Sequence, residues 1–258
     1  MGPASKTANV LMYHRVNDHD HDGLTTPTSV FDQMMRELKK RYQVISLAEL
    51  VRTVVEGGSL GNKVAITFDD GYRDNLISAA PILKKHDIPA TFFVTTGYIA
   101  TTKVFPWDST NSIKNSLMSW EDVRELSGLG FEIGAHTVNH PDLGAATLVD
   151  ARWEIRASKQ AIESEIGRKV ESFAFPFGKR ESCPEEVSKI VSEEGYSCCC
   201  LGYGGKVGRN SDVFRLNRIP MYPTTIDLLM EIDSFLTYFD GWTRFAGIPV
   251  IRHNVNAW

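Results

Sequence analysis

The sequence predicts an α/β fold in which parallel strands form one barrel-like sheet with helices on its outside. Apolar runs typical of buried strands alternate about seven times with stretches of helical periodicity. A length of 258 residues suits one large domain. Polar residues that could carry chemistry follow the ends of several predicted strands, and barrel enzymes hold their active sites at that edge. A doubly wound open sheet is the alternative.

In the first part of the chain, residues 9–13 are expected to form a strand that ends at His14. Ser29 and Ser46 each precede apolar residues at helical spacing, so both are expected to cap helices. The polar loop before the first helix could bind a metal, but we expect it to be flexible and solvated. Its acidic and histidine residues are Asp18, His19, Asp20, His21 and Asp22.

The centre of the chain is organised around a buried strand, residues 64–68, that runs into Asp69, Asp70 and Gly71. Strand side chains alternate between faces, so a turn at Gly71 is needed to aim both carboxylates at one point. Burying two carboxylates is unfavourable unless a cation or a proton-transfer role retains them. A polar strand end followed by an Asp-Gly turn is the simpler alternative.

The rest of the chain continues the alternation of strands and helices. Residues 97–118 have little periodicity and are interpreted as a long, functional excursion, and the tail 241–258 gives no pattern. The remaining predicted elements are a helix over 75–86 kinked at Pro81, strands over 89–95, 131–135, 172–177, 196–201 and 215–220, and helices beginning near Ser119, Thr147, Pro184 and Thr225.

Composition excludes several classes of protein. A net charge of -4 without a block of Lys or Arg gives no signature of nucleic-acid binding. We find no apolar run long enough for a transmembrane helix and no apolar signal segment at Met1. This predicts a cytoplasmic location, with export as the alternative if a signal segment has been removed. Cys183 and the consecutive residues 198–200 do not form a disulfide framework, and we expect them to be buried as small apolar residues.

His136 and His140 are four residues apart, so a tight loop or one helical turn can direct both imidazoles at one ion. Together with one carboxylate of the Asp69–Asp70 pair, they would make a site of two histidines and one aspartate with an open position for water. Zinc suits these ligands best, and cobalt, nickel or iron could replace it. The second carboxylate would then serve as a general base.

These residues resemble the motifs of a known family, the polysaccharide deacetylases of the NodB-homology group, carbohydrate esterase family 4. Residues 67–71 (TFDDG) and 136–140 (HTVNH) look like its first two motifs, and 174–178 (AFPFG) look like a weaker form of the third. The resemblance covers about residues 8–222. It implies a single domain over 1–258 (core about 8–240, then the tail) with a distorted (β/α)₇ TIM-like barrel. It also implies metal-dependent removal of an N-acetyl group from an amino-sugar-containing glycan.

The resemblance also implies roles for individual residues. Asp69 would be the base, and Asp70, His136 and His140 would hold the metal, most often Zn²⁺ in such sites. Residues 11–15 (LMYHR) are similar to the poly-N-acetylglucosamine deacetylase subgroup, in which the first strand supplies a histidine; the match implies His14 as the general acid. The implied oxyanion and substrate contacts are the backbone N–H of Phe177, with Pro176, Gly178 and Tyr72.

One departure from the family concerns the base. The third motif usually carries an arginine that pairs with the base, but this chain has Ala174 there. Arg218 or Arg215 is expected to replace it, since both lie at the end of a late strand. The missing arginine leaves open a non-catalytic carbohydrate-binding protein. A deacylase acting on an O-acetyl, N-formyl or non-sugar amide substrate, and an enzyme of glycan biosynthesis inside the cell, are further interpretations.

Overall fold

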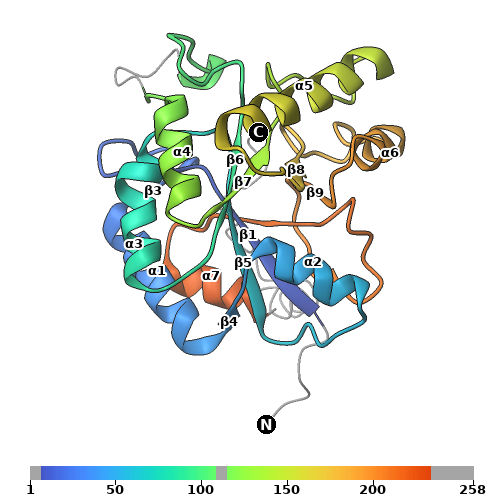
Figure 1. The fold of residues 1–258 in the computed structure, drawn as a ribbon. Helices are drawn as coiled ribbons and strands as arrows, with labels where there is room; N and C mark the ends of the chain where they lie inside the picture. Colours follow the sequence, from blue (N-terminus) through green and yellow to red (C-terminus); the bar gives the residue numbers. More distant parts are fainter. Residues whose placement is uncertain (1–6, 109–114, 234–258) are drawn as a thin grey trace, which may run out of the picture.

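The structure, a computed structural model, describes residues 7–108 and 115–233 (Figure 1). Its main sheet contains β1 (Thr7–Tyr13), β4 (Gln43–Val44), β5 (Lys63–Phe68), β6 (Thr91–Val94), β7 (Glu132–Ala135), β8 (Ser172–Ala174), β9 (Cys198–Cys200), β10 (Val207–Gly208) and β11 (Ile219–Pro220). The central order is β10-β1-β5-β6-β7-β8-β9, with β11 paired to β1 and β4 to β5. Every pair in this sheet is parallel except β1 with β10.

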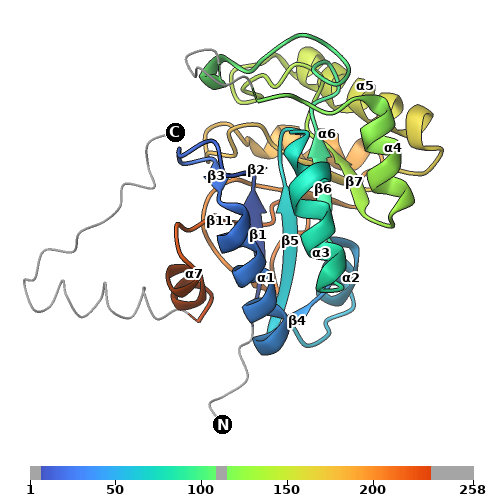
Figure 2. The ribbon, with the colours of Figure 1, turned by 90° about the vertical axis from the view of Figure 1, so that its left-hand side faces the viewer.

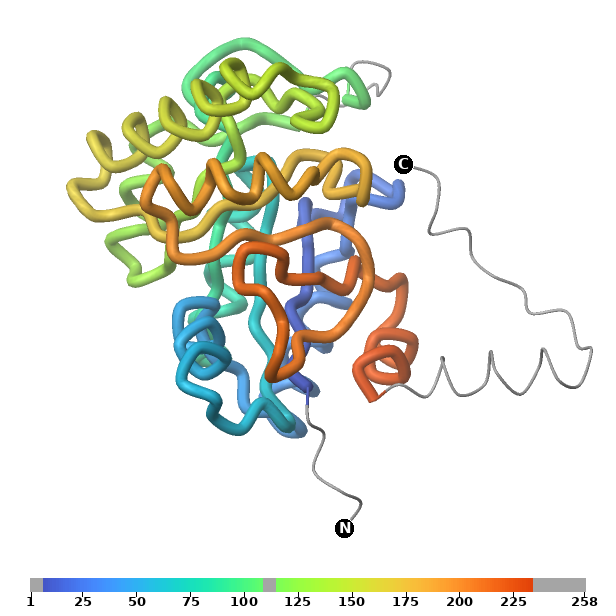
Figure 3. The backbone as a smooth tube through the Cα atoms, turned by 90° about the vertical axis from the view of Figure 1, so that its right-hand side faces the viewer, coloured from blue at the N-terminus to red at the C-terminus, as the bar shows by residue number. Residues whose placement is uncertain are grey.

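The sheet is strongly curled and forms a half-barrel, which confirms the predicted α/β class with a distorted barrel. One late segment lies against both ends of the curl. Leu216 bridges Cys200 of β9, and three residues later Ile219 of β11 pairs with Leu11 of β1. Figure 3 shows this segment, in orange, crossing one side of the molecule. Residues from β9 are thereby brought close to residues from β1 and β5.

Most helices lie outside the curled sheet (Figures 1 and 2), whereas the helix over Leu47–Val55 packs against inward-facing strand residues. The helices are α1 (Thr28–Arg41), α2 (Leu47–Val55), α3 (Ala80–Lys85), α4 (Trp120–Gly128), α5 (Leu148–Ile166), α6 (Glu185–Glu193) and α7 (Thr225–Ile232), with a π-helical turn at Asn75–Ala79 and a 3₁₀ turn at Pro106–Asp108. A small parallel pair, β2 (Arg15–Val16) with β3 (Thr25–Thr26), lies above the end of β1. Figure 2 shows α1 and α3 side by side next to β1 and β5.

The apolar core has two parts. The larger cluster packs outward-facing strand residues against the helices, and it includes Phe68, Phe92 and Phe173. The smaller cluster joins α2 to inward-facing strand residues, several of which are small: Ala8, Ala65, Ala174, Cys198 and Cys200. All four cysteines are buried and unpaired, as predicted. Small inward-facing residues leave room inside the sheet for a few large polar side chains.

Most predicted boundaries agree with local hydrogen bonding. The Ser46 side chain accepts from the backbone of Glu49, and Ser119 forms a reciprocal capping box with Asp122. Ser29 is an exception, because α1 begins at Thr28 after Pro27, whose ring fixes a suitable φ of -57°.

The predicted kink at Pro81 takes the form of a wide π-helical turn. The N–H of Ala80 reaches back to the carbonyl of Asn75, five residues earlier. Proline has no N–H for the α-helical pattern and its ring clashes with the preceding turn, so the chain widens just before it. Within the described ranges, no helix is long and apolar enough to cross a membrane. The predicted tail 241–258 and residues 109–114 of the excursion lie outside those ranges.

Candidate active site

Two histidines and one aspartate converge at the carboxyl ends of two strands. Asp70 follows β5, whereas His136 and His140 belong to the segment that follows β7. One ligand atom from each of the three residues lies within 4.8 Å of the other two. The Oδ1 atom of Asp70 is 3.5 Å from Nε2 of His136 and 3.4 Å from Nε2 of His140. Two imidazole nitrogens and one carboxylate oxygen form a donor set that divalent transition metals accept.

The surroundings of His136 fit a cation at this point. Its Nδ1 lies 2.8 Å from the carbonyl oxygen of Ala174. A carbonyl oxygen only accepts, so Nδ1 carries the proton and the lone pair of Nε2 faces Asp70. Burial lowers the pKa of His136, but Asp69 and Asp70 outweigh it and hold that pKa above its usual value. The same negative field favours a bound cation, so the group is consistent with a divalent metal site.

Backbone strain is concentrated in this region. Asp70, Thr137, His140 and Phe177 have φ angles of 76°, 65°, 55° and 60°. Side chains other than glycine rarely occupy this left-handed region, and each such residue costs about 1–3 kcal/mol. The positive φ of Asp70, followed by 88° at Gly71, lets both neighbouring carboxylates turn toward the open end of the sheet.

Asp69 is held by a buried ion pair with Arg218. Each carboxylate oxygen of Asp69 accepts one hydrogen bond of 2.6 Å, from Nη1 and Nη2 of the guanidinium. The same guanidinium donates to the carbonyl of Leu201 at 2.7 Å and to Oγ1 of Thr67 at 3.1 Å. Burial raises the pKa of Asp69, but the charges of Arg218 and His136 lower it by a larger amount. The pKa of Asp69 therefore lies below its usual value. Asp69 is therefore an ionised carboxylate with a fixed orientation.

Of the two arginines expected to replace the missing one, only Arg218 lies beside Asp69. The guanidinium of Arg215 instead donates to the carbonyl of Cys183 at 2.9 Å and to Oγ of Ser188 at 3.1 Å. Arg218 comes just before β11, whereas Ala174 ends β8. The small side chain of Ala174 belongs to the inner cluster. The guanidinium that pairs with Asp69 comes from Arg218 and not from this position of β8.

His14 lies between β1 and β2 at the same end of the sheet. Its carbonyl accepts a hydrogen bond of 2.7 Å from the side chain of buried Asn75. Its Nδ1 atom is buried without a hydrogen-bond partner among the described residues. Burial lowers the pKa of His14, although the nearby Asp70 and Asp69 act in the opposite direction.

The third predicted segment forms a tight turn beside His140. Pro176 is buried, whereas the Phe177 side chain is 50% exposed. At Gly178 a Cβ atom would lie only 2.1 Å from the backbone nitrogen of Gly202, so no larger residue fits there. The ring of Phe177 meets His140 edge to face, with centroids 4.9 Å apart. Within the described chain, the backbone N–H of Phe177 makes no hydrogen bond.

Trp107 completes an aromatic wall that the sequence did not identify. Its ring lies 5.2 Å from His140 and 6.4 Å from Phe177, and it stacks on Phe105 at 4.7 Å between centroids. The only sequence signal was its place in the long excursion. Tyr72 was predicted to contact substrate, but its side chain is 1% exposed. Its hydroxyl accepts from Nε1 of Trp107 at 2.9 Å, so Tyr72 lies behind the wall.

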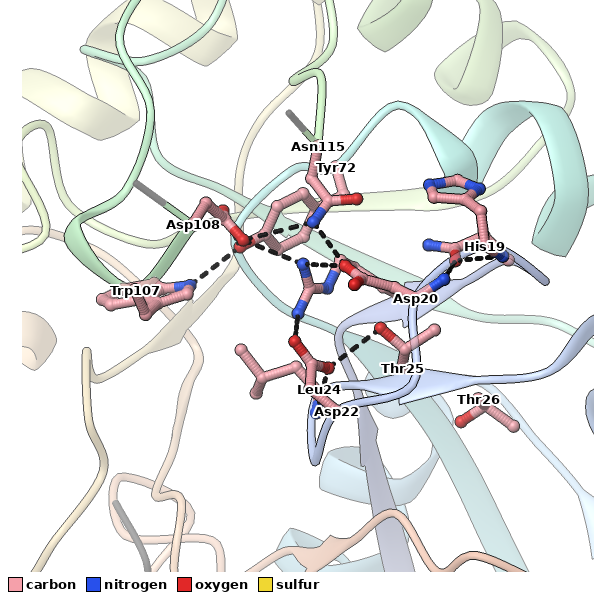
Figure 4. A network of polar contacts seen from close by, with 12 residues as sticks. His19, Asp20, Asp22, Leu24, Thr25, Thr26, Tyr72, Trp107, Asp108 and Asn115 are labelled. Atoms are coloured by element: carbon pink, nitrogen blue, oxygen red, sulfur yellow. Dashed lines mark hydrogen bonds and ion pairs between the residues drawn. The ribbon is translucent and has the colours of Figure 1, made fainter. Parts of the chain in front are cut away.

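Asp20 and Asp22 of the loop after β1 lie near Asp108 and Tyr72 behind the aromatic wall (Figure 4). A buried arginine joins the two groups. Arg15 is 0% exposed and forms ion pairs of 2.9, 2.5 and 2.8 Å with Asp20, Asp22 and Asp108. Its guanidinium carbon lies 5.1 Å from the ring centre of Tyr72, whose hydroxyl donates to Asp108 at 2.8 Å. Trp107 is therefore linked through Tyr72 and Asp108 to Arg15, the residue that follows His14.

The loop over residues 17–28 was expected to be flexible and solvated; Asp18, His19 and His21 are indeed exposed, but other parts of the loop are held in place. Asp20 and Asp22 are anchored on Arg15, and the loop contains the β2–β3 pair. Its histidines, His19 and His21, do not belong to a metal-binding group among the residues that the structure describes. The sequence suggested a solvated loop because the buried arginine that neutralises these carboxylates lies outside it.

Comparison with known proteins identifies the family. The sequence profile of the polysaccharide deacetylase family matches residues 57–199. The YxkH protein of Bacillus subtilis is 27% identical over 216 residues, which span 83% of this chain and 71% of that protein. The poly-beta-1,6-N-acetyl-D-glucosamine N-deacetylase of Staphylococcus epidermidis is 25% identical over an alignment of 266 positions, which covers 93% of this chain and 84% of the relative.

Solved structures agree with this result. The Streptococcus pyogenes deacetylase PplD, solved in complex with acetate, superposes with a TM-score of 0.74 and is 26% identical. The match covers 88% of this chain and 98% of that one. The sequence profile, the curled sheet and the group of Asp70, His136 and His140 thus lead to the same conclusion, that this chain belongs to the polysaccharide deacetylase family.

Proposed function

We propose that this protein is a metal-dependent hydrolase that removes an N-acetyl group from an amino sugar of a glycan. The observation that carries the proposal is the placement of Asp69, fixed and ionised, immediately before the metal-ligand candidate Asp70. One carboxylate is paired with Arg218 and the other faces two imidazoles. This arrangement gives the two neighbouring aspartates different roles.

Asp70, His136 and His140 would hold the cation. Zinc suits the donor set, and cobalt, nickel or iron are alternatives. When bound, such a cation polarises an acyl carbonyl and makes water a better nucleophile near neutral pH. Asp69 would take the proton of the attacking water, because it is ionised and Arg218 keeps its oxygens oriented.

Two further groups would complete the hydrolysis. The unpaired backbone N–H of Phe177 is suited to stabilise the oxyanion that forms on the acyl oxygen. His14 would protonate the departing amine, and because burial lowers its pKa, its protonated ring is a stronger acid toward that nitrogen. The exposed face of Phe177 and the half-buried Trp107 would pack against the substrate beside His140.

Similarity to named relatives supports the choice of an N-acetylated sugar. The Staphylococcus epidermidis relative is named for deacetylation of poly-beta-1,6-N-acetyl-D-glucosamine, and PplD was solved with acetate. We propose a β-1,6-linked N-acetylglucosamine oligomer as the first substrate to try. O-acetyl, N-formyl and non-sugar amide substrates are the alternatives. The alternative of a non-catalytic carbohydrate-binding protein rested on the missing arginine, and the contact between Arg218 and Asp69 argues against it.

The decisive experiment compares three proteins for acetate release and metal content. Wild type should release acetate from N-acetylated glucosamine oligomers, lose that activity with a chelator, and regain it with zinc or cobalt. Asp69→Asn should retain the metal but lose at least about 100-fold in turnover. His136→Ala should lose metal and turnover together. Acetate release by Asp69→Asn at the wild-type rate would refute the mechanism, and metal binding without turnover on any acyl sugar would favour the binding protein.

A further inference from the structure

The loop between His136 and His140 has a demanding shape. It has no helix or strand of its own, and two of its residues, Thr137 and His140, have positive φ angles of 65° and 55°. Threonine is branched at Cβ and strongly disfavours this region. Such a shape persists only when surrounding groups hold it. The contacts of this loop therefore determine where the imidazole of His140 lies.

One side of the loop is held by the segment after β6. The backbone N–H groups of Thr96 and Gly97 donate to the carbonyls of Thr137 and Val138, at 3.1 and 2.8 Å. A Cβ atom on Gly97 would lie 2.6 Å from the carbonyl oxygen of Val138, so glycine is needed for this approach. These contacts satisfy the carbonyl side of the loop and leave its N–H groups to find acceptors elsewhere.

The other side of the loop is held by a single carboxylate on α5. Glu154 is 6% exposed, and its Oε2 accepts from the backbone N–H groups of Val138 and Asn139, at 2.7 and 2.9 Å. Its Oε1 accepts from the side-chain amide of Asn139 at 2.8 Å. The loop closes on itself where Oγ1 of Thr137 accepts from the N–H of His140 at 3.0 Å. Glu154 thus collects three donors from the residues between the two histidines.

We propose that Glu154 is a positioning residue for the metal site, acting by holding residues 137–140 in the shape that brings His140 Nε2 to within 3.4 Å of Asp70 Oδ1. The proposal rests on the proposed function, since it concerns the same cation. A carboxylate suits the task because it only accepts hydrogen bonds, and both of its oxygens face donors. Groups that orient metal ligands without touching the metal commonly change metal affinity by about 10–100-fold when removed.

The test uses Glu154→Met, which keeps the length and helix propensity of the side chain but removes its acceptors. The matched control is Glu165→Met on the same helix, where the carboxylate makes only a surface ion pair with Arg124. Competition titration should show zinc and cobalt affinity reduced about 10–100-fold in Glu154→Met and unchanged in Glu165→Met. The visible absorption of bound cobalt should change only in Glu154→Met, because it reports the ligand geometry.

Glu154→Gln provides the rescue. One glutamine oxygen can still accept from both backbone N–H groups, and its amide can donate to Asn139 once that amide turns over. Gln should therefore recover most of the lost affinity, which a simple loss of helix packing would not explain. Should Glu154→Met fail to fold, the exposed Asn139→Ala variant loses only the side-chain bond to Oε1 and should weaken metal binding by about twofold to tenfold.

Different failures are distinguishable. Unchanged metal affinity and an unchanged cobalt spectrum in Glu154→Met, or in Asn139→Ala if the first variant does not fold, would overturn the role of Glu154 and leave the proposed function intact. Absence of metal binding in the wild type itself would overturn both. A Glu165→Met variant as defective as Glu154→Met would also refute the assignment, because the effect would then belong to helix α5 as a whole.

Discussion

Arg218 and Asp69, which are 149 residues apart in the sequence, meet in a two-point ion pair with both contacts at 2.6 Å. The pair is buried, and the arginine also bonds Leu201 and Thr67. Asp69 is thereby connected both to the chain just after β9 and to β5. Several properties of the protein should depend on this contact.

Replacing Arg218 with methionine should strongly reduce activity. The change leaves Asp69 buried without a counter-charge, which removes its orientation and costs about 3–5 kcal/mol of folding free energy. Turnover should fall by about 100-fold or more, with metal content retained in the folded fraction. Arg215→Met is the matched control, since that guanidinium bonds Cys183 and Ser188, and its turnover should stay near wild type. Equal turnover in both variants would contradict a role for Arg218.

Acid should reduce the difference in stability between the wild type and Arg218→Met. In the wild type the folded-state pKa of Asp69 is below its unfolded value of about 3.9, so its stabilisation is present above that value and is lost as the pH falls toward the folded-state pKa. In Arg218→Met the guanidinium is absent and burial raises the pKa of Asp69. The contribution of Asp69 to stability then changes sign: its buried charge destabilises the protein at neutral pH, and this cost disappears as the pH falls. Urea unfolding of the metal-free proteins between pH 6 and 3 should show the gap narrowing below about pH 5. A constant gap would mean that Asp69 is not ionised in the wild type.

Trp107→Ala should weaken substrate binding more than it slows the chemical step. The indole forms the wall beside His140 and Phe177, and such an aromatic contact contributes about 1 kcal/mol or more. We expect KM to rise about tenfold while kcat and metal content change little. Trp153→Ala, which removes an exposed tryptophan from α5, should leave both kinetic constants unchanged. An unchanged KM in Trp107→Ala would place the sugar elsewhere.

Arg15→Met should destabilise the protein by about 3–5 kcal/mol, since it leaves buried Asp108 and its neighbours without a counter-charge. Burial already raises the pKa of Asp108 despite its contacts with Tyr72 and Arg15. The urea midpoint should fall clearly below that of Arg41→Met, which removes only an exposed pair with Glu37. Similar midpoints in the two variants would show that the network on Arg15 contributes little to stability.

Local sequence patterns determined most of the fold and part of the candidate site. Apolar periodicity predicted the strands and helices, and Ser46 and Ser119 marked helix starts because caps depend on neighbours within a few residues. The carboxyl ends of parallel strands share one edge of the sheet, so Asp70 could be expected to meet His136 and His140. Their convergence is now seen in the structure.

Contacts between distant parts of the chain were decided only by the tertiary structure. The sequence offered Arg218 and Arg215 equally, and the curl of the sheet places only Arg218 beside Asp69. The sequence of the acidic loop after β1 predicted a solvated segment, because it does not show that Arg15 of β2 pairs with Asp20 and Asp22. Trp107 and Glu154 carry no local signal of their positions against His140 and its loop. The physical reason is that burial and charge pairing depend on neighbours in space, whereas periodicity and capping depend on neighbours in sequence.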